Sequence, residues 1–364
     1  MTKKESVLKF FLVAVCIFAV AFSFAEPERT ADAVRSALFL CAHKVVPGVF
    51  IFMVAARVLA LLGAARAFSR ITGGFLERLF GVSAGGAAVI TIGLFAGYPT
   101  GAALAFELVR SGELDAHEAE RIIPFATAAS PAFLLASVGK LCGERFGAVM
   151  LASQIASALL LLLLTRGKRA SKSAGGDAKT SARPLAALSS ALKSSGATAI
   201  NICSFVTFFC VLSEIVLSLL PLGVQTESFG ALVSGLMEIS CGFSHLAGCG
   251  GALGYFCGGA MLGFGGFSVL LQSADAAGDC GFCARKYLLF KMLQGLICGA
   301  IAVALGAFCE QKFIGAFVFF GEEQGKIVAL WQICALFALI FAFLLLILKI
   351  FAKIFKKLWK KSNM

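Results

Sequence analysis

Charged residues are scarce in this sequence. Only 14% of its 364 residues are Asp, Glu, Lys or Arg, whereas 59% are hydrophobic, and the mean hydropathy is +0.92. Soluble domains carry about 25% charged residues and lack repeated apolar runs of about 18 residues or more. The shortage of charge therefore excludes a soluble protein and indicates a chain that crosses a membrane several times.

Signatures of enzymatic chemistry are scarce too. The sequence contains no Walker loop for a nucleotide and no His-Glu-x-x-His pair for a catalytic zinc ion, and we expect no nucleophile-elbow serine. A membrane-embedded enzyme acting on a lipid-linked substrate would need clustered His, Asp and Glu, but the three histidines are dispersed. We expect no enzymatic activity, no ATP-driven transport by this chain alone and no cofactor.

Cysteine pairs with metal or redox spacing are rare as well. Of thirteen cysteines, only Cys280 and Cys283 form a Cys-x-x-Cys pair, and no second pair lies at ligand distance from it. Cysteines within apolar segments behave as small hydrophobic residues. The sequence favours ordinary loop cysteines at this pair and predicts no metal site.

The net charge of +12 comes largely from basic residues at the ends of apolar segments. Such residues orient membrane helices, because cytoplasmic loops carry an excess of Lys and Arg. They place both termini and the basic segment 166–193 in the cytoplasm. The expected partner is the lipid bilayer, not nucleic acid, and the expected location is a cell membrane crossed many times.

The apolar segments divide the chain into two halves. Residues 1–25 predict an N-terminal membrane anchor helix, although Ser23 and Ala25 also fit a signal-peptide cleavage site. The remaining expected domains are a first repeat (34–165), a flexible basic linker (166–193), a second repeat (194–308), a last membrane helix (328–348) and a basic cytoplasmic tail (349–364).

One segment in each half is expected to enter the membrane and return. Three apolar candidates lie between Arg78 and Arg166, which are both cytoplasmic, yet the number of crossings between them must be even. The segment 86–109 contains Gly-Tyr-Pro, which opposes helix continuation, so it is predicted to be re-entrant. In the second half, the same parity selects 231–249.

The halves begin on opposite sides of the membrane, so they form an inverted repeat. Short matches support a duplication: Arg57 aligns with Glu214, and Phe95–Gly101 aligns loosely with Gly263–Val269. The predicted fold class is an all-α polytopic membrane protein of about 8–10 membrane segments, in two inverted repeats with broken or re-entrant helices. This architecture is typical of transporters, whose solute site lies near the midplane at the repeat interface.

Broken helices supply the candidate solute site of the first half. Pro99 suits the first turn of a helix that begins inside the membrane, and the free N–H groups there suit an anion. Tyr98 offers a ring and a hydroxyl, and Ser130-Pro131 repeats the break in the next segment. The candidates in this half are Gly97, Tyr98, Pro99, Thr100, Gly101, Ser130 and Pro131.

The second half offers a similar set. Gly265 and Gly266 allow close approach of the backbone, and Ser268 and Gln272 lie four residues apart on one helix face. Taken singly, the serines also fit simple helix packing. Glu238 completes the candidate substrate-binding residues, because ionisable groups within the membrane usually mark a pathway or a partnered site.

Two pairs of ionisable residues allow two interpretations each, and a further ionisable residue allows one. Glu238 and His245 form either a proton-coupling pair or a packed polar contact. Arg57 and Glu214 either pair with each other or bind the solute. Lys291, near a helix start, is expected to extend its ammonium to the membrane surface.

Five motifs occur in a fixed order along residues 36–308: Val45–Leu59, Gly93–Ala102, Glu118–Gly139, Gly235–Gly242 and Gly263–Gln272. Together they resemble the YlbJ-type sporulation integral membrane proteins. That family contains nucleoside-recognition, or Gate, domains, which also occur in concentrative nucleoside transporters and ferrous-iron permeases. The resemblance implies an endospore-forming bacterium and a role in spore maturation, linked to the movement of dipicolinate, a planar dicarboxylate. One departure is that Ala102 and Ala103 stand where the family commonly has a lysine.

We therefore expect a membrane transporter or permease for a small polar or anionic solute in a bacterial cell membrane, with dipicolinate as the solute by family resemblance. The alternative is a non-transporting membrane scaffold for spore-envelope assembly, in which the basic linker and tail bind partners or lipids. The sequence leaves open whether the chain forms a homo-oligomer.

Overall fold

A computed structural model describes residues 3–62, 74–167, 183–219, 227–247 and 251–312. Within these ranges the chain is helical and contains no β-strand. Residues up to Val303 form one compact unit, and of the following unit only residues 304–312 are described. The all-α prediction is confirmed, whereas the predicted last helix (328–348) and tail lie outside the described residues.

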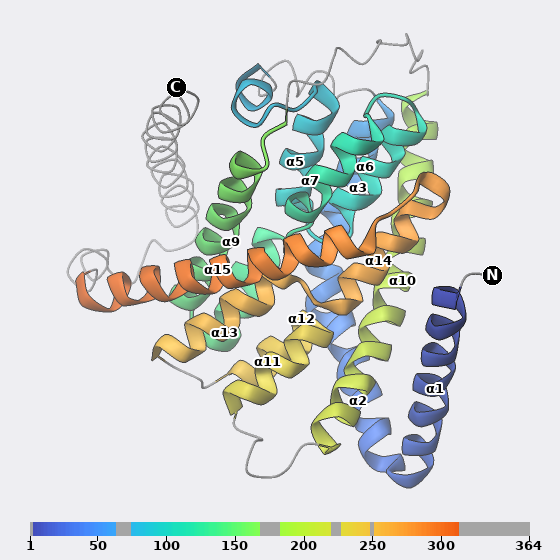
Figure 1. The fold of residues 1–364 in the computed structure, drawn as a ribbon, viewed down its shortest axis with the longest axis vertical. Coiled ribbons are helices and arrows are strands. Elements are labelled where there is room, and N and C mark those ends of the chain that lie inside the picture. The colour runs from blue at the N-terminus through green and yellow to red at the C-terminus, as the bar shows by residue number, and fades with distance from the viewer. Residues whose placement is uncertain (1–2, 63–73, 168–182, 220–226, 248–250, 313–364) are drawn as a thin grey trace. The chain divides into compact units, whose positions relative to one another are not determined.

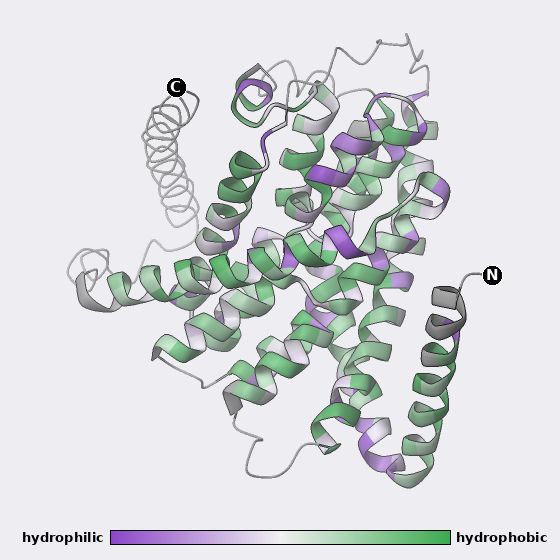
Figure 2. Ribbon diagram, in the orientation of Figure 1, coloured by the Kyte–Doolittle hydropathy of each residue, from purple (hydrophilic) through white to green (hydrophobic). Residues whose placement is uncertain are grey.

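Among the described residues, five helical stretches are long and apolar enough to cross a membrane, and a sixth is formed if the bent pair 74–80 and 84–96 counts as one span. The five are Pro27–Val58, Glu144–Leu164, Pro184–Leu219, Gly251–Cys280 and Ala284–Cys309. The ribbons are hydrophobic along most of their length, and hydrophilic residues gather on α6, α7 and the turn between α1 and α2 (Figure 2). Large apolar side chains such as Ile17, Ile200 and Leu296 are more than half exposed, as lipid-facing residues would be.

The N-terminal part forms one wall of the unit. Helix α1 (Lys3–Ala25) is followed by α2 (Pro27–Leu40), the π-helical turn η1 (Cys41–Val45) and α3 (Val46–Leu61), which run on as one span. Helix α10 (Pro184–Leu219) packs along this span through a shared core that includes Met53, Ile202 and Val206 (Figure 1).

The start of α10 corrects the predicted linker. The segment 166–193 was expected to be flexible, but its last ten residues, from Pro184 onward, are helical. Proline is well suited to a first helical turn, and the following Ala, Leu and Lys residues favour helix. Residues 168–182 of the predicted linker lie outside the described ranges.

Both segments predicted to be re-entrant are helical hairpins. Helix α5 (Ala84–Ala96) turns at 97–99 into α6 (Thr100–Arg110), and a Cβ on Gly101 would lie 3.0 Å from Gly93 Cα, so the helices fold back on each other. Helix α11 (Glu227–Met237) turns at Glu238 into α12 (Ile239–Leu246), where Gly242 lies directly against Gly235. Glycines permit both close approaches because a side chain at either position would collide with backbone.

An interrupted helix follows each hairpin. Helix α7 (Ala116–Ala126) ends in a non-helical stretch, 127–130, before η2 (Phe133–Val138) and α8 (Gly139–Cys142). In the second half, α13 (Gly251–Phe264) is interrupted at Gly265 before α14 (Gly266–Ala277) and the 3-10 turn η4 (Gly278–Cys280). A long helix then closes each half, α9 (Glu144–Leu164) in the first and α15 (Ala284–Lys312) in the second.

The order of the breaks changes the expected alignment of the halves. Each half runs hairpin, interrupted helix, long helix, so the hairpin turn 97–99 corresponds to Glu238, and the break 127–130 corresponds to Gly265. The sequence match of Phe95–Gly101 with Gly263–Val269 was therefore wrong. It paired a hairpin with an interrupted helix, because both stretches are glycine-rich.

Small residues bring α13 and α15 together. Gly259 and Gly263 are spaced four apart on α13, and Gly295 and Gly299 are spaced likewise on α15. A Cβ on Gly263 would lie 2.6 Å from the carbonyl oxygen of Gln294, and one on Gly295 would lie 2.8 Å from that of Ala260. Such small-xxx-small faces let helix backbones approach closely in membranes. The contact fixes α15 beside the break at Gly265.

Candidate functional site

The hairpin turn of the first half contacts the interrupted helix of the second. The Tyr98 hydroxyl donates a hydrogen bond of 3.1 Å to the carbonyl oxygen of Leu262 in α13. A Cβ on Gly265 would lie 3.4 Å from the same hydroxyl. The sequence predicted both residues as site residues, and the structure brings them into contact.

Within each half, the hairpin turn also lies against the break of the neighbouring interrupted helix. Gly97 has a φ of +83°, and a Cβ there would lie 3.0 Å from Ser130 Cβ. In the second half, Gly266 has a φ of +85°, and a Cβ there would lie 3.2 Å from the carbonyl oxygen of Met237. Positive φ and crowding both favour glycine at these two positions. The four breaks therefore form a connected group.

Polar side chains replace the helical hydrogen bonds missing at the break 127–130. Gln154 of α9 accepts a hydrogen bond from Ala129 N–H (2.8 Å) and donates one to the Ala129 carbonyl (2.9 Å). The Ser130 hydroxyl accepts from Phe133 N–H (3.2 Å) and so caps the helix that resumes near Pro131. Unpaired backbone groups at membrane depth are costly, so these bonds stabilise the break.

Lys291 lies buried beside the breaks, and the prediction of its position from the sequence was wrong. It was expected to reach the membrane surface, but its side chain is 1% exposed. Its Nζ donates to the carbonyl oxygen of Thr127 (3.1 Å) and to Oε1 of Gln294 (3.0 Å), and its Cε lies 3.4 Å from the Cβ position of Gly265. The end of α7 at Thr127 frees a carbonyl that an ammonium can satisfy. The sequence signal that could have predicted this buried lysine is the presence of a lysine and a glutamine three residues apart in an apolar helix.

A cavity of about 390 Å³ opens beside this group, between α3, α6, α10 and α14. Pro99 and Gln272, both predicted site residues, line it. The other polar and charged lining residues come from four helices: Arg57, Glu107, Arg110, Ser190, Ser194, Thr198, Asn201 and Asp275. The volume is in the range of small-molecule sites, about 300–1,000 Å³.

Two arginines in the cavity keep donors available for a ligand. Arg57 donates from Nη2 to the Thr198 hydroxyl (2.7 Å), and Arg110 donates from Nη2 to the carbonyl oxygen of Ala276 (2.6 Å). A guanidinium has five N–H donors, and paired donors match a carboxylate. Glu107 and Asp275 line the same cavity, so cations and anions are balanced there.

Pairing of Arg57 with Glu214, one of the two interpretations that the sequence allowed, does not occur in the structure. His245 lies beside Glu214, with Nε2 3.9 Å from Oε1, whereas Arg57 bonds Thr198. Arg57 on α3 and Glu214 on α10 occupy equivalent positions in the two repeats. Equivalent positions need not be in contact, and these two side chains have different partners. Arg57 lines the cavity between α3, α6, α10 and α14.

The remaining predicted residues have structural partners or packing roles. The Ser268 hydroxyl accepts a hydrogen bond from Gln272 Nε2 at 3.0 Å. Glu238 is 3% exposed and caps α12, accepting from Ser240 N–H (2.7 Å) and Cys241 N–H (3.1 Å). Thr100 is buried, and its hydroxyl has no hydrogen-bond partner among the described residues. Gly101 serves the close contact of α6 with α5.

A Gly-x-Ser-x-Gly sequence at Gly81–Gly85 has the spacing of a nucleophile elbow, so the expectation that the chain has no such motif overlooked a match in the sequence. In the structure, Ser83 is the N-cap of α5, and its hydroxyl accepts from Gly86 N–H at 3.1 Å. The Ser83 N–H donates to Oε1 of Glu118 at 2.6 Å. Helix capping accounts for this serine.

Comparisons with known proteins agree with this description. No protein-family model matches the chain. The sporulation integral membrane protein YlbJ of Bacillus subtilis (strain 168) is 23% identical, over 79% of this chain and 80% of its own length. The chain is similar to YlbJ. The predicted resemblance is thereby confirmed, and so is a multi-pass membrane protein.

Two solved structures of CNTnw also align with the chain. An outward-facing double variant covers 84% of this chain and 86% of its own, with 14% identity and a TM-score of 0.46. An inward-facing, substrate-bound state covers 83% of each chain, with 13% identity and a TM-score of 0.44. These likenesses concern the course of the backbone alone.

Proposed function

We propose that this chain is a membrane transporter or permease for a small polar or anionic solute. The observation that carries the proposal is the cavity between α3, α6, α10 and α14, which reaches Pro99 in the turn of the first hairpin. Helices broken at corresponding positions of two repeats, with a cavity between them, are the arrangement by which transporters hold a solute near the midplane. The solute would lie at the N-terminal end of α6, whose first N–H groups favour negative charge.

We further propose dipicolinate, or a closely similar planar dicarboxylate, as the solute, with a role in spore maturation. The similarity to a sporulation protein supports the setting. Arg57 and Arg110 support the substrate class, because two guanidiniums in one cavity can hold two carboxylates. They would supply the positive charge that the family's lysine gives elsewhere and that Ala102 and Ala103 lack here.

Uptake into proteoliposomes tests the proposal. The purified chain is reconstituted and supplied with labelled dipicolinate, a linear dicarboxylate or a nucleoside. Saturable uptake of dipicolinate is expected, with loss in Arg57→Gln and Arg110→Gln. Arg145→Gln is the matched control, because Arg145 is exposed on α9 and does not line the cavity.

The outcomes separate the readings. Uptake of a nucleoside but of no dicarboxylate would support the transporter function and contradict the proposal of an anionic solute. No saturable uptake of any of these solutes would favour the membrane scaffold. That alternative depends on the basic linker and tail, most of which lies outside the described residues.

A further inference from the structure

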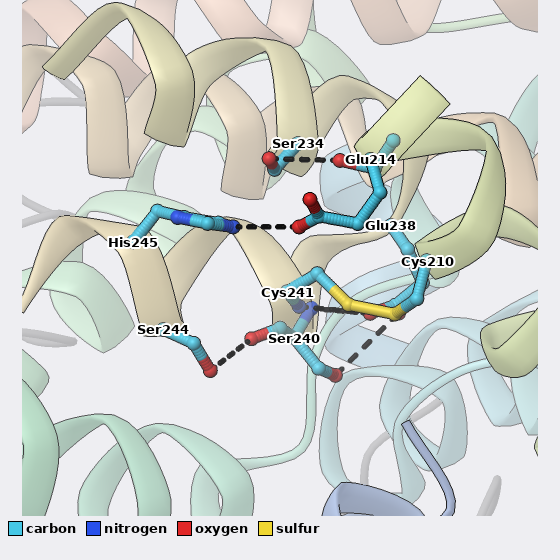
Figure 3. The surroundings of a disulfide bond; sticks show 9 residues. Cys210, Glu214, Ser234, Glu238, Ser240, Cys241, Ser244 and His245 are labelled. Atoms are coloured by element: carbon cyan, nitrogen blue, oxygen red, sulfur yellow. Dashed lines mark hydrogen bonds and ion pairs between the residues drawn. A yellow bond between two sulfur atoms is a disulfide. The ribbon is translucent and has the colours of Figure 1, made fainter. Parts of the chain in front are cut away.

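Two cysteines and a glutamate converge where α12 meets α10. Cys210 lies on α10, Glu238 forms the hairpin turn and Cys241 lies in the first turn of α12 (Figure 3). Their two sulfur atoms and a carboxylate oxygen all lie within 4.8 Å of one another. We propose that these three residues bind a single thiophilic divalent cation, such as Zn²⁺, when the cysteines are reduced.

The distances suit such an ion. Zinc binds thiolate sulfur at about 2.3 Å and carboxylate oxygen at about 2.0–2.2 Å. Tetrahedral coordination then separates two sulfur ligands by about 3.8 Å and a sulfur from an oxygen by about 3.5 Å. The two sulfur atoms are bonded to each other in the structure, so after reduction they must move apart to about 3.8 Å. Side-chain rotation can supply this movement, because the Cys210 and Cys241 Cα atoms are 6.3 Å apart and the carboxylate oxygen already lies within 4.8 Å of both sulfur atoms. Three protein ligands leave the fourth position for water.

The carboxylate of Glu238 is held in place by its neighbours. It accepts hydrogen bonds from Ser240 N–H (2.7 Å), Cys241 N–H (3.1 Å) and the Ser240 hydroxyl (3.4 Å). A carboxylate has about four lone-pair sites, so about one remains for a metal. Hydrogen bonds of this kind fix the orientation of metal-ligating carboxylates.

Burial makes a cation at this place favourable. Cys210 is 5% and Glu238 3% exposed, and negative charge in such surroundings is costly unless it is paired. Two thiolates and a carboxylate around a divalent ion pair their charges directly. Cys241 is partly exposed and is the least buried of the three.

The same two sulfur atoms are joined in the structure as a disulfide. A disulfide sulfur is not a thiolate ligand, so the covalent bond and the metal exclude each other. A phosphine attacks one sulfur atom and breaks the S–S bond, and water then hydrolyses the phosphorus–sulfur adduct. The water oxygen ends in the phosphine oxide, and its two protons end on the two thiols. Metal binding then releases the thiol protons. Either link ties the second hairpin to α10, which lines the cavity.

Zinc titration of the purified full-length protein in detergent tests the proposal. The protein carries Cys280→Ser and Cys283→Ser, because that Cys-x-x-Cys pair could take up zinc by itself. One portion is reduced with a phosphine, a second is oxidised with diamide, and both are titrated with Zn²⁺ against a chromophoric chelator. The reduced portion should bind one equivalent and the oxidised portion none.

Variants then assign the ligands. Cys210→Ser and Cys241→Ser should lose the equivalent, and Ser240→Ala should keep it with an affinity about 10–100-fold weaker, as for other residues that orient a ligand. Cys203→Ser is the matched control: Cys203 lies two turns earlier on α10 and is not one of the three converging groups, so its equivalent should be retained.

Three results would overturn the site: no equivalent in the reduced protein, the same binding in the oxidised protein, or unchanged binding in both Cys210→Ser and Cys241→Ser. Circular dichroism shows whether the variants keep their helical content. Should they fail to fold, the reduced and oxidised portions of the parent protein still decide the question.

Discussion

The hydroxyl of Tyr98 donates a 3.1 Å hydrogen bond to the carbonyl oxygen of Leu262, and this bond joins the first hairpin to the interrupted helix of the second half. Tyr98 also lies against Gly265, where α13 stops and α14 begins. The contact connects residues 164 positions apart. In the proposed transporter, it links the wall of the solute cavity to an element of the opposite repeat.

Substitution of Tyr98 tests this link. Tyr98→Phe removes only the hydroxyl, so we expect the free energy of unfolding in detergent to fall by about 0.5–1.5 kcal/mol.

Two alanine variants test the role of the hairpin turn in transport. Tyr98→Ala also removes the ring, and Pro99→Ala alters the start of α6; both should abolish solute uptake while the protein still inserts in the membrane. Uptake in proteoliposomes and the amount of protein in the membrane fraction are the measurements. Normal uptake in both alanine variants would exclude this hairpin turn from the site.

Gly97→Ala tests the contact between the first hairpin and the neighbouring break. Gly97 and Gly143 both have positive φ, +83° and +104°, and Gly143 has nothing within 4 Å of its Cβ position, whereas Gly97 faces Ser130 at 3.0 Å. Each alanine should cost about 1–3 kcal/mol for the backbone. Gly97→Ala should cost more than Gly143→Ala in denaturant unfolding, because crowding adds to it. Equal losses would show that Ser130 yields freely.

Lys291→Met tests the buried ammonium. The substitution leaves the Thr127 carbonyl without its donor, and an unpaired buried acceptor costs about 1–3 kcal/mol. We expect that loss in the free energy of unfolding, together with reduced uptake. Lys140→Met is the control, because Lys140 is exposed on α8. Wild-type stability in Lys291→Met would mean that another group, or water, satisfies Thr127.

The carboxyl of Glu118 gives a pH-dependent prediction. This residue lies on α7, outside the membrane-spanning helices, and burial raises its pKa above the ordinary value of 4.5 despite hydrogen bonds from Ser83 and the nearby Arg121. The unfolded chain therefore ionises first, and the wild type loses stability as the pH rises from about 4.5 through the folded-state pKa.

Glu118→Gln should not show this loss, since an amide does not ionise. Its stability relative to wild type should increase across that interval and then level off. Unfolding midpoints of both proteins between about pH 4 and pH 8 are the measurement. A difference that is independent of pH would contradict the raised pKa.

The breaks in the helices could be predicted from sequence because local chemistry causes them. Gly97 and Pro99 oppose helix at one place, and the parity of crossings required a segment that returns. The hairpin around Glu238 was found in the same way. Conformational preferences of single residues, together with the parity of crossings, were sufficient to predict these elements.

The partners of the breaks could not be predicted, since they come from distant helices. The buried ammonium of Lys291 bonds the carbonyl of Thr127, 164 residues away in the sequence. Gln154 bonds the backbone of Ala129, which follows the end of α7. Arg57 reaches the cavity through Thr198, 141 residues along the chain. Cys210 and Cys241 meet only when α12 folds back on α11, so their spacing in sequence carried no metal signal.

The bonds between the halves run in both directions. Tyr98 of the first half donates a hydrogen bond to a backbone carbonyl of the second half, and Lys291 of the second half donates one to a backbone carbonyl of the first. Without its partner half, the carbonyl of Leu262 or of Thr127 would lose this donor, so each half completes the hydrogen bonding of the other.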